Sequence, residues 1–118
     1  METNPFIKLK IPGVIGTIPE HYRNISLYDN AGESISIYVG MLAQDAYDFG
    51  WLVYIPDGTR NERLPGQGSG YFKTEIDALR FGSYALRSIF YKKLSDQAKN
   101  ILDSYIRSLS QPSLFDEI

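Results

Sequence analysis

The sequence predicts an α+β fold: a small antiparallel β-sheet of three to five strands, packed on one face by a carboxy-terminal two-helix hairpin. The first half of the chain alternates apolar and polar residues with the period of two that half-buried strands show. The second half repeats apolar residues at helical spacing behind two capping residues. Because the chain has 118 residues, 43% of them hydrophobic, it has the size and apolar content of one domain with its own core.

We expect this single domain to occupy residues 1–110. Its sheet is predicted within residues about 6–73, and its helices at about 75–91 and 96–108. Residues 111–118 contain a proline and two large apolar residues with no evident partner, which predicts a flexible carboxy-terminal tail.

Strand character begins near the amino terminus. Residues 6–11 alternate isoleucine and leucine with lysine, as a half-buried strand does. The best hairpin signal comes from strands at 24–28 and 33–42, which flank Asp-Asn-Ala-Gly at 29–32, a cluster that accepts turn conformations. Residues 49–55 (FGWLVYI) are too apolar for an exposed edge, so we expect a central strand there.

The connections between these strands are polar. Residues 44–48 predict a bridge in which Asp45 and Asp48 form a solvated turn. Residues 59–70 predict a long, irregular and mobile loop, because charged residues, a proline and three glycines follow one another. Residues 71–73 are expected as a short strand that returns to the sheet.

Both helices have recognisable starts. Thr74 is expected to cap the first helix and Ser95 the second, and the short link between them predicts an antiparallel hairpin. Gly82 costs about 1 kcal/mol relative to alanine inside a helix, so we expect the second helix or the inner sheet face to approach it closely. The predicted core face of the first helix consists of Ala78, Leu79, Gly82, Ala85, Leu86 and Ile89.

Composition excludes several classes of function. The chain has no cysteine, which rules out disulfides, a cysteine zinc site and thiol chemistry. We find no signal-peptide pattern and no apolar run of about 18 residues, and therefore expect a soluble, cytoplasmic protein without a membrane partner. The net charge of −2 argues against sequence-blind adhesion to nucleic acid but leaves a local basic face open.

No motif predicts catalysis. A phosphate-binding loop needs its lysine directly after the last glycine, whereas Tyr71 and Phe72 separate Gly70 from Lys73. The only histidine, His21, has no second histidine to complete a metal site. We therefore predict no catalytic residue, no metal and no cofactor. An enzyme with residues 56–72 as a lid is the third-ranked alternative.

One face of the first helix carries the main binding hypothesis. Arg80, Tyr84, Arg87 and Tyr91 follow one another at steps of four, three and four, which places them in one narrow stripe at about 100° per residue. Guanidinium groups can contact phosphates, and rings can contact bases. A solvated face or a protein-binding surface are the alternatives. The residues expected to join the stripe from the loop and the helix start are Arg60, Arg63 and Lys73.

The tail carries the most specific short pattern. Gln111-Pro112-Ser113-Leu114-Phe115 resembles the Gln-x-x-Leu-Phe peptide by which many bacterial DNA polymerases, repair proteins and replication accessory factors dock onto the sliding clamp. The resemblance covers five residues and implies that Gln111 enters a polar subsite while Leu114 and Phe115 fill an apolar pocket. Pro112 stands where an aliphatic residue is commoner. Alternatively, Leu114 and Phe115 fold back onto the domain's own core.

Together these patterns predict a non-enzymatic, DNA-associated accessory or binding protein that docks on a replication clamp through its tail. The alternative is a protein-interaction or inhibitor domain. Such a domain would use the same Tyr/Arg face or a sheet edge, with its oligomeric state left open.

Overall fold

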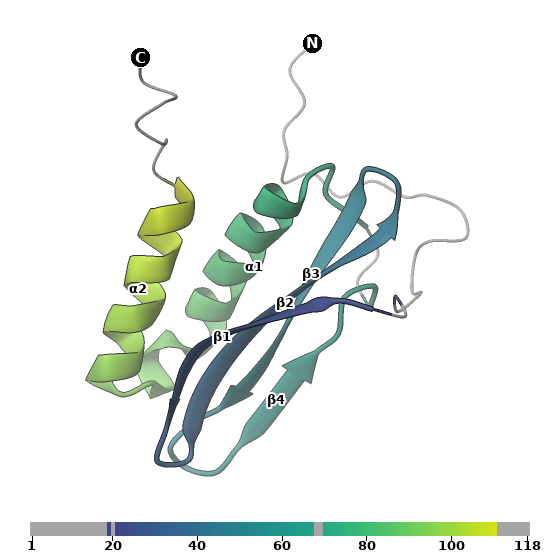
Figure 1. Cartoon of the computed structure of the whole chain (residues 1–118). Helices are drawn as coiled ribbons and strands as arrows, with labels where there is room; N and C mark the ends of the chain where they lie inside the picture. Colours follow the sequence, from purple (N-terminus) through teal and green to yellow (C-terminus); the bar gives the residue numbers. More distant parts are fainter. Residues whose placement is uncertain (1–18, 20, 68–69, 111–118) are drawn as a thin grey trace, which may run out of the picture.

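The predicted fold class is confirmed. The computed structural model describes residues 19, 21–67 and 70–110, so the strand expected at 6–11 and the tail at 111–118 lie outside the described residues. Four antiparallel strands form a sheet in the order β1-β2-β3-β4, and both helices cover one face of it (Figure 1). The elements are β1 (Arg23–Asn30), β2 (Glu33–Ala43), β3 (Ala46–Tyr54), β4 (Arg60–Arg63), α1 (Glu75–Phe90), the 3₁₀ turn η1 (Tyr91–Lys93) and α2 (Asp96–Ser110).

The predicted hairpin is β1 and β2, and it is tighter than expected. Asn30 pairs with Glu33, so only Ala31 and Gly32 form the turn, with φ angles of 52° and 85°. Both residues of the turn therefore adopt the left-handed backbone that the favoured two-residue hairpins need. The aspartate and asparagine expected in the turn belong to β1 instead.

The central strand is confirmed, but it begins earlier than predicted. β3 lies between β2 and β4 and starts at Ala46, which leaves only Gln44 and Asp45 as the turn. The expected polar bridge at 44–48 is therefore wrong for its last three residues. Ala46 is fully buried, and pairing with β2 satisfies the backbone of this segment.

β4 corrects the predicted irregular loop. Residues 60–63 form an edge strand although their side chains, Arg-Asn-Glu-Arg, show no apolar alternation. Polar groups across the sheet explain this pairing: Trp51 Nε1 donates to Asn61 Oδ1 at 2.8 Å, and the Tyr38 hydroxyl donates to Glu62 at 2.9 Å. Farther along, residues 71–73 make only an isolated bridge, between Phe72 and Tyr47.

Both predicted helix caps are present. Thr74 Oγ1 accepts a hydrogen bond from the Asp77 amide at 3.2 Å, and Ser95 Oγ accepts one from the Ala98 amide at 3.3 Å. Glu33 also accepts hydrogen bonds from the Ser95 amide and hydroxyl, at 2.9 and 2.5 Å. The start of β2 is therefore tied to the start of α2, which fixes the helical hairpin on the sheet.

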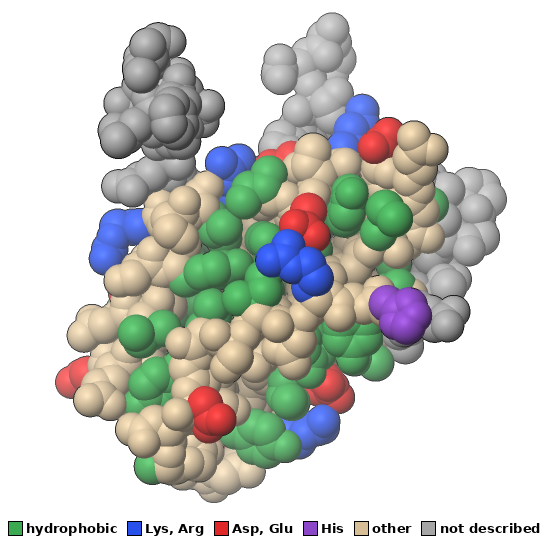
Figure 2. Space-filling model, viewed as in Figure 1, with side chains coloured by type: hydrophobic (Ala, Val, Ile, Leu, Met, Phe, Trp, Pro, Cys, Tyr) green, Lys and Arg blue, Asp and Glu red, His purple; other side chains and the backbone are tan. Residues whose placement is uncertain are grey.

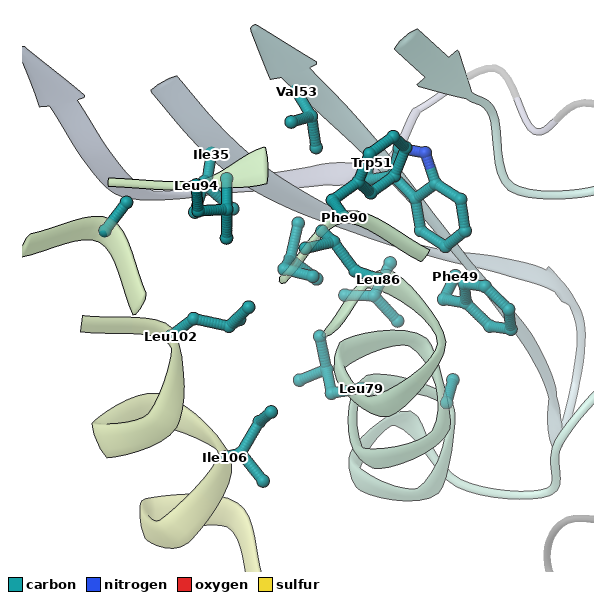
Figure 3. Packing of buried hydrophobic residues seen from close by; sticks show 14 of the residues in the cluster. Ile35, Phe49, Trp51, Val53, Leu79, Leu86, Phe90, Leu94, Leu102 and Ile106 are labelled. Atoms are coloured by element: carbon teal, nitrogen blue, oxygen red, sulfur yellow. The ribbon is translucent and has the colours of Figure 1, made fainter. Parts of the chain in front are cut away.

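The core lies between the sheet and the two helices, where side chains from all three converge (Figure 3). A Cβ on Gly82 would meet Phe49 at 2.7 Å, so the close neighbour expected at this glycine is the inner sheet face. The placement of Ile89 in the core is wrong, since 57% of it is exposed. Ser83, Leu86 and Phe90 form the buried side of the last turns of α1 instead, which leaves Ile89 on the flank.

Candidate functional site

The predicted Arg/Tyr stripe lies along the junction of α1 and α2. Arg80 Nε donates to the Leu109 carbonyl at 2.7 Å. Arg87 Nε donates to Asp103 Oδ1 at 2.8 Å, and the Tyr91 hydroxyl donates to Asp103 Oδ2 at 2.7 Å. Three of the four stripe residues are therefore bonded to α2, whereas Tyr84 stands out with 50% of its surface exposed.

The second helix adds charges that the sequence hypothesis did not include. Lys99 Nζ lies 5.3 Å from the centre of the Tyr91 ring, and Arg87 Cζ lies 4.0 Å from it. The pKa of Asp103 is lowered mainly by the hydrogen bonds from Arg87 and Tyr91, and the nearby charge of Arg107 adds to this effect. We call this surface the helix seam; it consists of Arg80, Tyr84, Arg87, Tyr91, Lys99, Asp103 and Arg107, together with Asp77, which pairs with Arg80.

Spacing along α2 could have identified these additional residues. Positions 99, 103 and 107 step by four and so share one helix face. What could not be read from spacing is the rotation of α2 about its axis, which decides whether this face meets α1 or solvent.

The seam is positively charged within an acidic protein. Four cationic side chains, two from each helix, face two carboxylates, Asp77 and Asp103, which leaves a net charge of plus two. The hydrogen bonds from Arg87 and then Tyr91 lower the pKa of Asp103 below its ordinary value, and the same contacts raise the pKa of Arg87 and of Tyr91. At neutral pH, Asp103 is therefore anionic, Arg87 is cationic and Tyr91 is a neutral hydrogen-bond donor.

Contacts with α2 fix the two arginines of α1, while part of each side chain stays exposed to solvent. Each uses Nε to bond to α2, and the side chains of Arg80 and Arg87 remain 36% and 41% exposed. A guanidinium fixed in this way loses little conformational entropy when it binds a further anion.

The remaining predicted contact residues lie elsewhere. Arg60 and Arg63 belong to β4, the sheet edge opposite the β1 strand that α2 contacts. Arg60 donates to Glu62 and to the Tyr54 hydroxyl, both at 3.0 Å. Lys73 is exposed just before α1. The structure therefore separates the loop arginines from the stripe that they were expected to join.

Arg63 has a buried partner that the sequence hypothesis placed in solvent. Asp48 is only 1% exposed and accepts hydrogen bonds from Arg63 at 3.2 and 3.3 Å and from the Gly66 amide at 2.7 Å. The predicted solvated turn is therefore wrong for Asp48, because the early start of β3 carries it inside. We call Asp48, Arg63 and Gly66 the clasp.

A groove of about 410 Å³ is the second candidate site. It lies where the start of β1 and the end of β2 meet the first turn of α1, and Arg23 and Glu75 form an ion pair of 2.5 Å on its wall. Val39, Met41 and Tyr47 contribute apolar lining. The chain's one histidine, His21, also lines it and is the purple side chain in Figure 2, beside apolar ones. No group of three or more potential metal ligands occurs within the described residues.

Comparisons with protein-family models, with curated proteins and with solved structures found no match to this chain. Within the part of the chain that the structure describes, no helix is both long enough and apolar enough to cross a bilayer.

Proposed function

We propose that the protein is a non-enzymatic, DNA-associated binding protein that contacts phosphates through the helix seam. The observation that supports this is the local excess of cations along the helix seam, on two helices that each carry two cations and two carboxylates, in a chain whose net charge is −2. Arginine suits such contacts because its planar fork can bind two phosphate oxygens at once. Packing against α2 orients Arg80 and Arg87 in advance.

Tyr84 is the residue that would contact bases. It lies four residues after Arg80 and three before Arg87, so its exposed ring stands between the two guanidinium groups on the same stripe. Stacking of a base on an aromatic ring contributes about 1–3 kcal/mol and tolerates any base. We therefore expect binding with weak sequence preference and a preference for unpaired strands.

The test is fluorescence anisotropy with labelled single-stranded and duplex oligonucleotides over a series of salt concentrations. Lys99→Glu with Arg107→Glu should weaken binding and reduce the salt slope by about 2, because each lost phosphate contact removes close to one unit. The control is Arg60→Glu with Lys93→Glu, which makes the same change of charge outside the seam: Arg60 is on β4, and the charge of Lys93 acts on Asp57 in the turn before β4. Arg63 is left unchanged because it belongs to the clasp. If both double variants lose the same DNA affinity, or if the wild type does not bind DNA at low salt, the seam is not the DNA-binding surface.

We further propose that the tail docks on a sliding clamp through Gln111, Leu114 and Phe115. Gln111 directly follows the last residue of α2, so the peptide begins where the described domain ends. Leu114→Ala with Phe115→Ala should abolish capture of a bacterial clamp, whereas Ser113→Ala should retain it. Capture of both variants at wild-type strength would contradict this part of the proposal.

A protein partner is the second candidate, and exposed apolar groups on α1 favour it. Ile89 is 57% exposed and Tyr84 is 50% exposed, on a helix that also carries two arginines. Tyrosine and arginine are enriched among the residues that dominate binding energies at protein interfaces. Size-exclusion chromatography with light scattering separates self-association from a monomer. A dimer that Ile89→Asp dissociates would favour this candidate over DNA binding.

A further inference from the structure

The end of α2 lies near the groove. Because α1 and α2 are antiparallel, the last turn of α2 is beside the first turns of α1, as Figure 1 shows and the bond from Arg80 to the Leu109 carbonyl confirms. One turn earlier, Tyr105 is close enough to the groove wall for both charges of the Arg23–Glu75 pair to act on its pKa, although burial is the largest influence and raises it. The chain therefore leaves α2 on the groove side of the molecule.

The groove and the tail have matching chemistry. Tyr47 and the 57% exposed Met41 provide an apolar surface, and Arg23, which pairs with Glu75 through one terminal nitrogen but is 60% exposed, lines the same groove with further nitrogen donors. A volume of about 410 Å³ is enough for two large side chains. In the tail, Leu114 and Phe115 are followed immediately by two carboxylates, Asp116 and Glu117.

The tail is also long enough to reach the groove. The five residues from Gln111 to Phe115 span at most about 18 Å when extended. Arg80, which contacts the end of α2, is five residues from Glu75 on the groove wall, a rise of about 7.5 Å along the helix. The rise along the helix is therefore within the reach of Leu114 and Phe115.

We propose that this groove binds the chain's own carboxy-terminal tail, with Leu114 and Phe115 on the apolar surface and Asp116 and Glu117 against Arg23. Its regulatory consequence rests on the proposed clamp docking, since the same Leu-Phe pair cannot fill the groove and the clamp pocket together. Only molecules whose tail is released can bind the clamp, so the apparent affinity for the clamp equals the intrinsic affinity multiplied by the released fraction. The protein would thus limit its own docking.

The chain offers a simple probe of this contact. It has two methionines, so methyl-labelled methionine gives two NMR signals, one of them from Met41 in the groove. In the full chain, Phe115→Leu should shift the Met41 methyl signal because it removes a ring from its surroundings. Phe6→Leu is the matched control at the other terminus and should leave Met41 unchanged. A Met41 shift caused by Phe6→Leu alone would assign the groove to the amino-terminal segment and overturn the proposal.

A spin label gives a second, independent readout. Because the chain has no cysteine, Ile118→Cys provides a single attachment point. The label should broaden the signals of Val39 and Met41, and Leu114→Ala with Phe115→Ala should abolish that broadening. Broadening that is absent, or that survives both alanines, would overturn the proposal.

The two proposals fail in different ways. The NMR contact needs no clamp, so it persists if the tail folds back but does not dock. If the tail folds back and docks, Met41→Glu should strengthen clamp binding severalfold by releasing it. If the chain binds the clamp but Phe115→Leu leaves the Met41 signal unchanged, the proposed binding of the tail in the groove is wrong, whereas clamp docking stands.

Discussion

The clasp and the helix seam each join an arginine to an aspartate, but in different surroundings. Asp48 of the clasp is 1% exposed and Arg63 is 21% exposed, whereas Asp103 and Arg87 of the seam are 26% and 41% exposed. The Arg63 guanidinium also stacks over the Phe49 ring at 4.2 Å. A buried carboxylate destabilises the fold when its cationic partner is removed, because its charge is then uncompensated. An exposed pair contributes little to stability, and its arginine stays available to other anions. The clasp is therefore structural, and the seam is the surface suited to binding.

The largest expected effect is on the clasp. Arg63→Met keeps the length of the side chain but leaves the Asp48 carboxylate buried with only the Gly66 amide as donor. We expect a loss of about 3 kcal/mol in the free energy of unfolding, at the low end for a broken buried pair because Arg63 is partly exposed. Urea unfolding followed by Trp51 fluorescence measures this.

Asp48→Asn added to Arg63→Met should recover part of that stability, because no uncompensated charge then remains inside. If Arg63→Met alone lowers the free energy of unfolding by less than about 1 kcal/mol, the clasp contributes no more than an exposed ion pair does, and the proposed difference between clasp and seam is wrong.

An intermediate effect is expected beneath the seam. Ser83 is fully buried on α1, and its hydroxyl has no hydrogen-bond partner among the described residues. Ser83→Ala should raise the free energy of unfolding by about 1 kcal/mol, since an unpaired buried hydroxyl is costly and alanine is the better helix former. Ser88→Ala, at an exposed position of the same helix, isolates the helix-propensity part. Thermal unfolding measures both variants. If Ser83→Ala stabilises the protein no more than Ser88→Ala does, the Ser83 hydroxyl has a hydrogen-bond partner in solution.

The smallest stability effect should be at the seam pair itself. Asp103→Asn should cost less than about 1 kcal/mol, since the pair is exposed. Its contacts hold the pKa of Asp103 below the ordinary 3.8, so the stabilisation is present above that value and is lost as pH falls through the folded-state pKa. The difference between wild type and variant should therefore be seen at pH 7 and disappear in acid.

The same variant should affect binding in the opposite direction. Removing the charge of Asp103 raises the net charge of the seam from plus two to plus three and weakens the contacts that hold Arg87 and Tyr91, since an amide oxygen is a weaker acceptor than a carboxylate. DNA affinity and its salt dependence should both increase in the anisotropy assay. Weaker binding would mean that Asp103 acts mainly by orienting the arginine.

Features that depend on neighbouring residues were predictable. Thr74 and Ser95 cap helices because their hydroxyls accept from amides three residues later, and the hairpin turn follows from flexible residues between two alternating stretches. Gly82 also indicated a close contact, because a glycine is unfavourable in a helix unless something needs the space.

Features that depend on partners distant in the chain were not predictable. β4 pairs through polar side chains that show no strand pattern, and Asp48 is buried because Arg63, 15 residues later, neutralises it.

By itself, the sequence determined the α+β class, the β1–β2 hairpin, the two helices and the Arg/Tyr stripe, because each rests on spacing within about 20 residues. The tertiary structure decided which charges are available. It turned Lys99, Asp103 and Arg107 of α2 toward the stripe, and it placed Arg60 and Arg63 at the far edge of the sheet. Periodicity defines the face of one helix, but only packing against the sheet sets the rotation of two helices relative to each other.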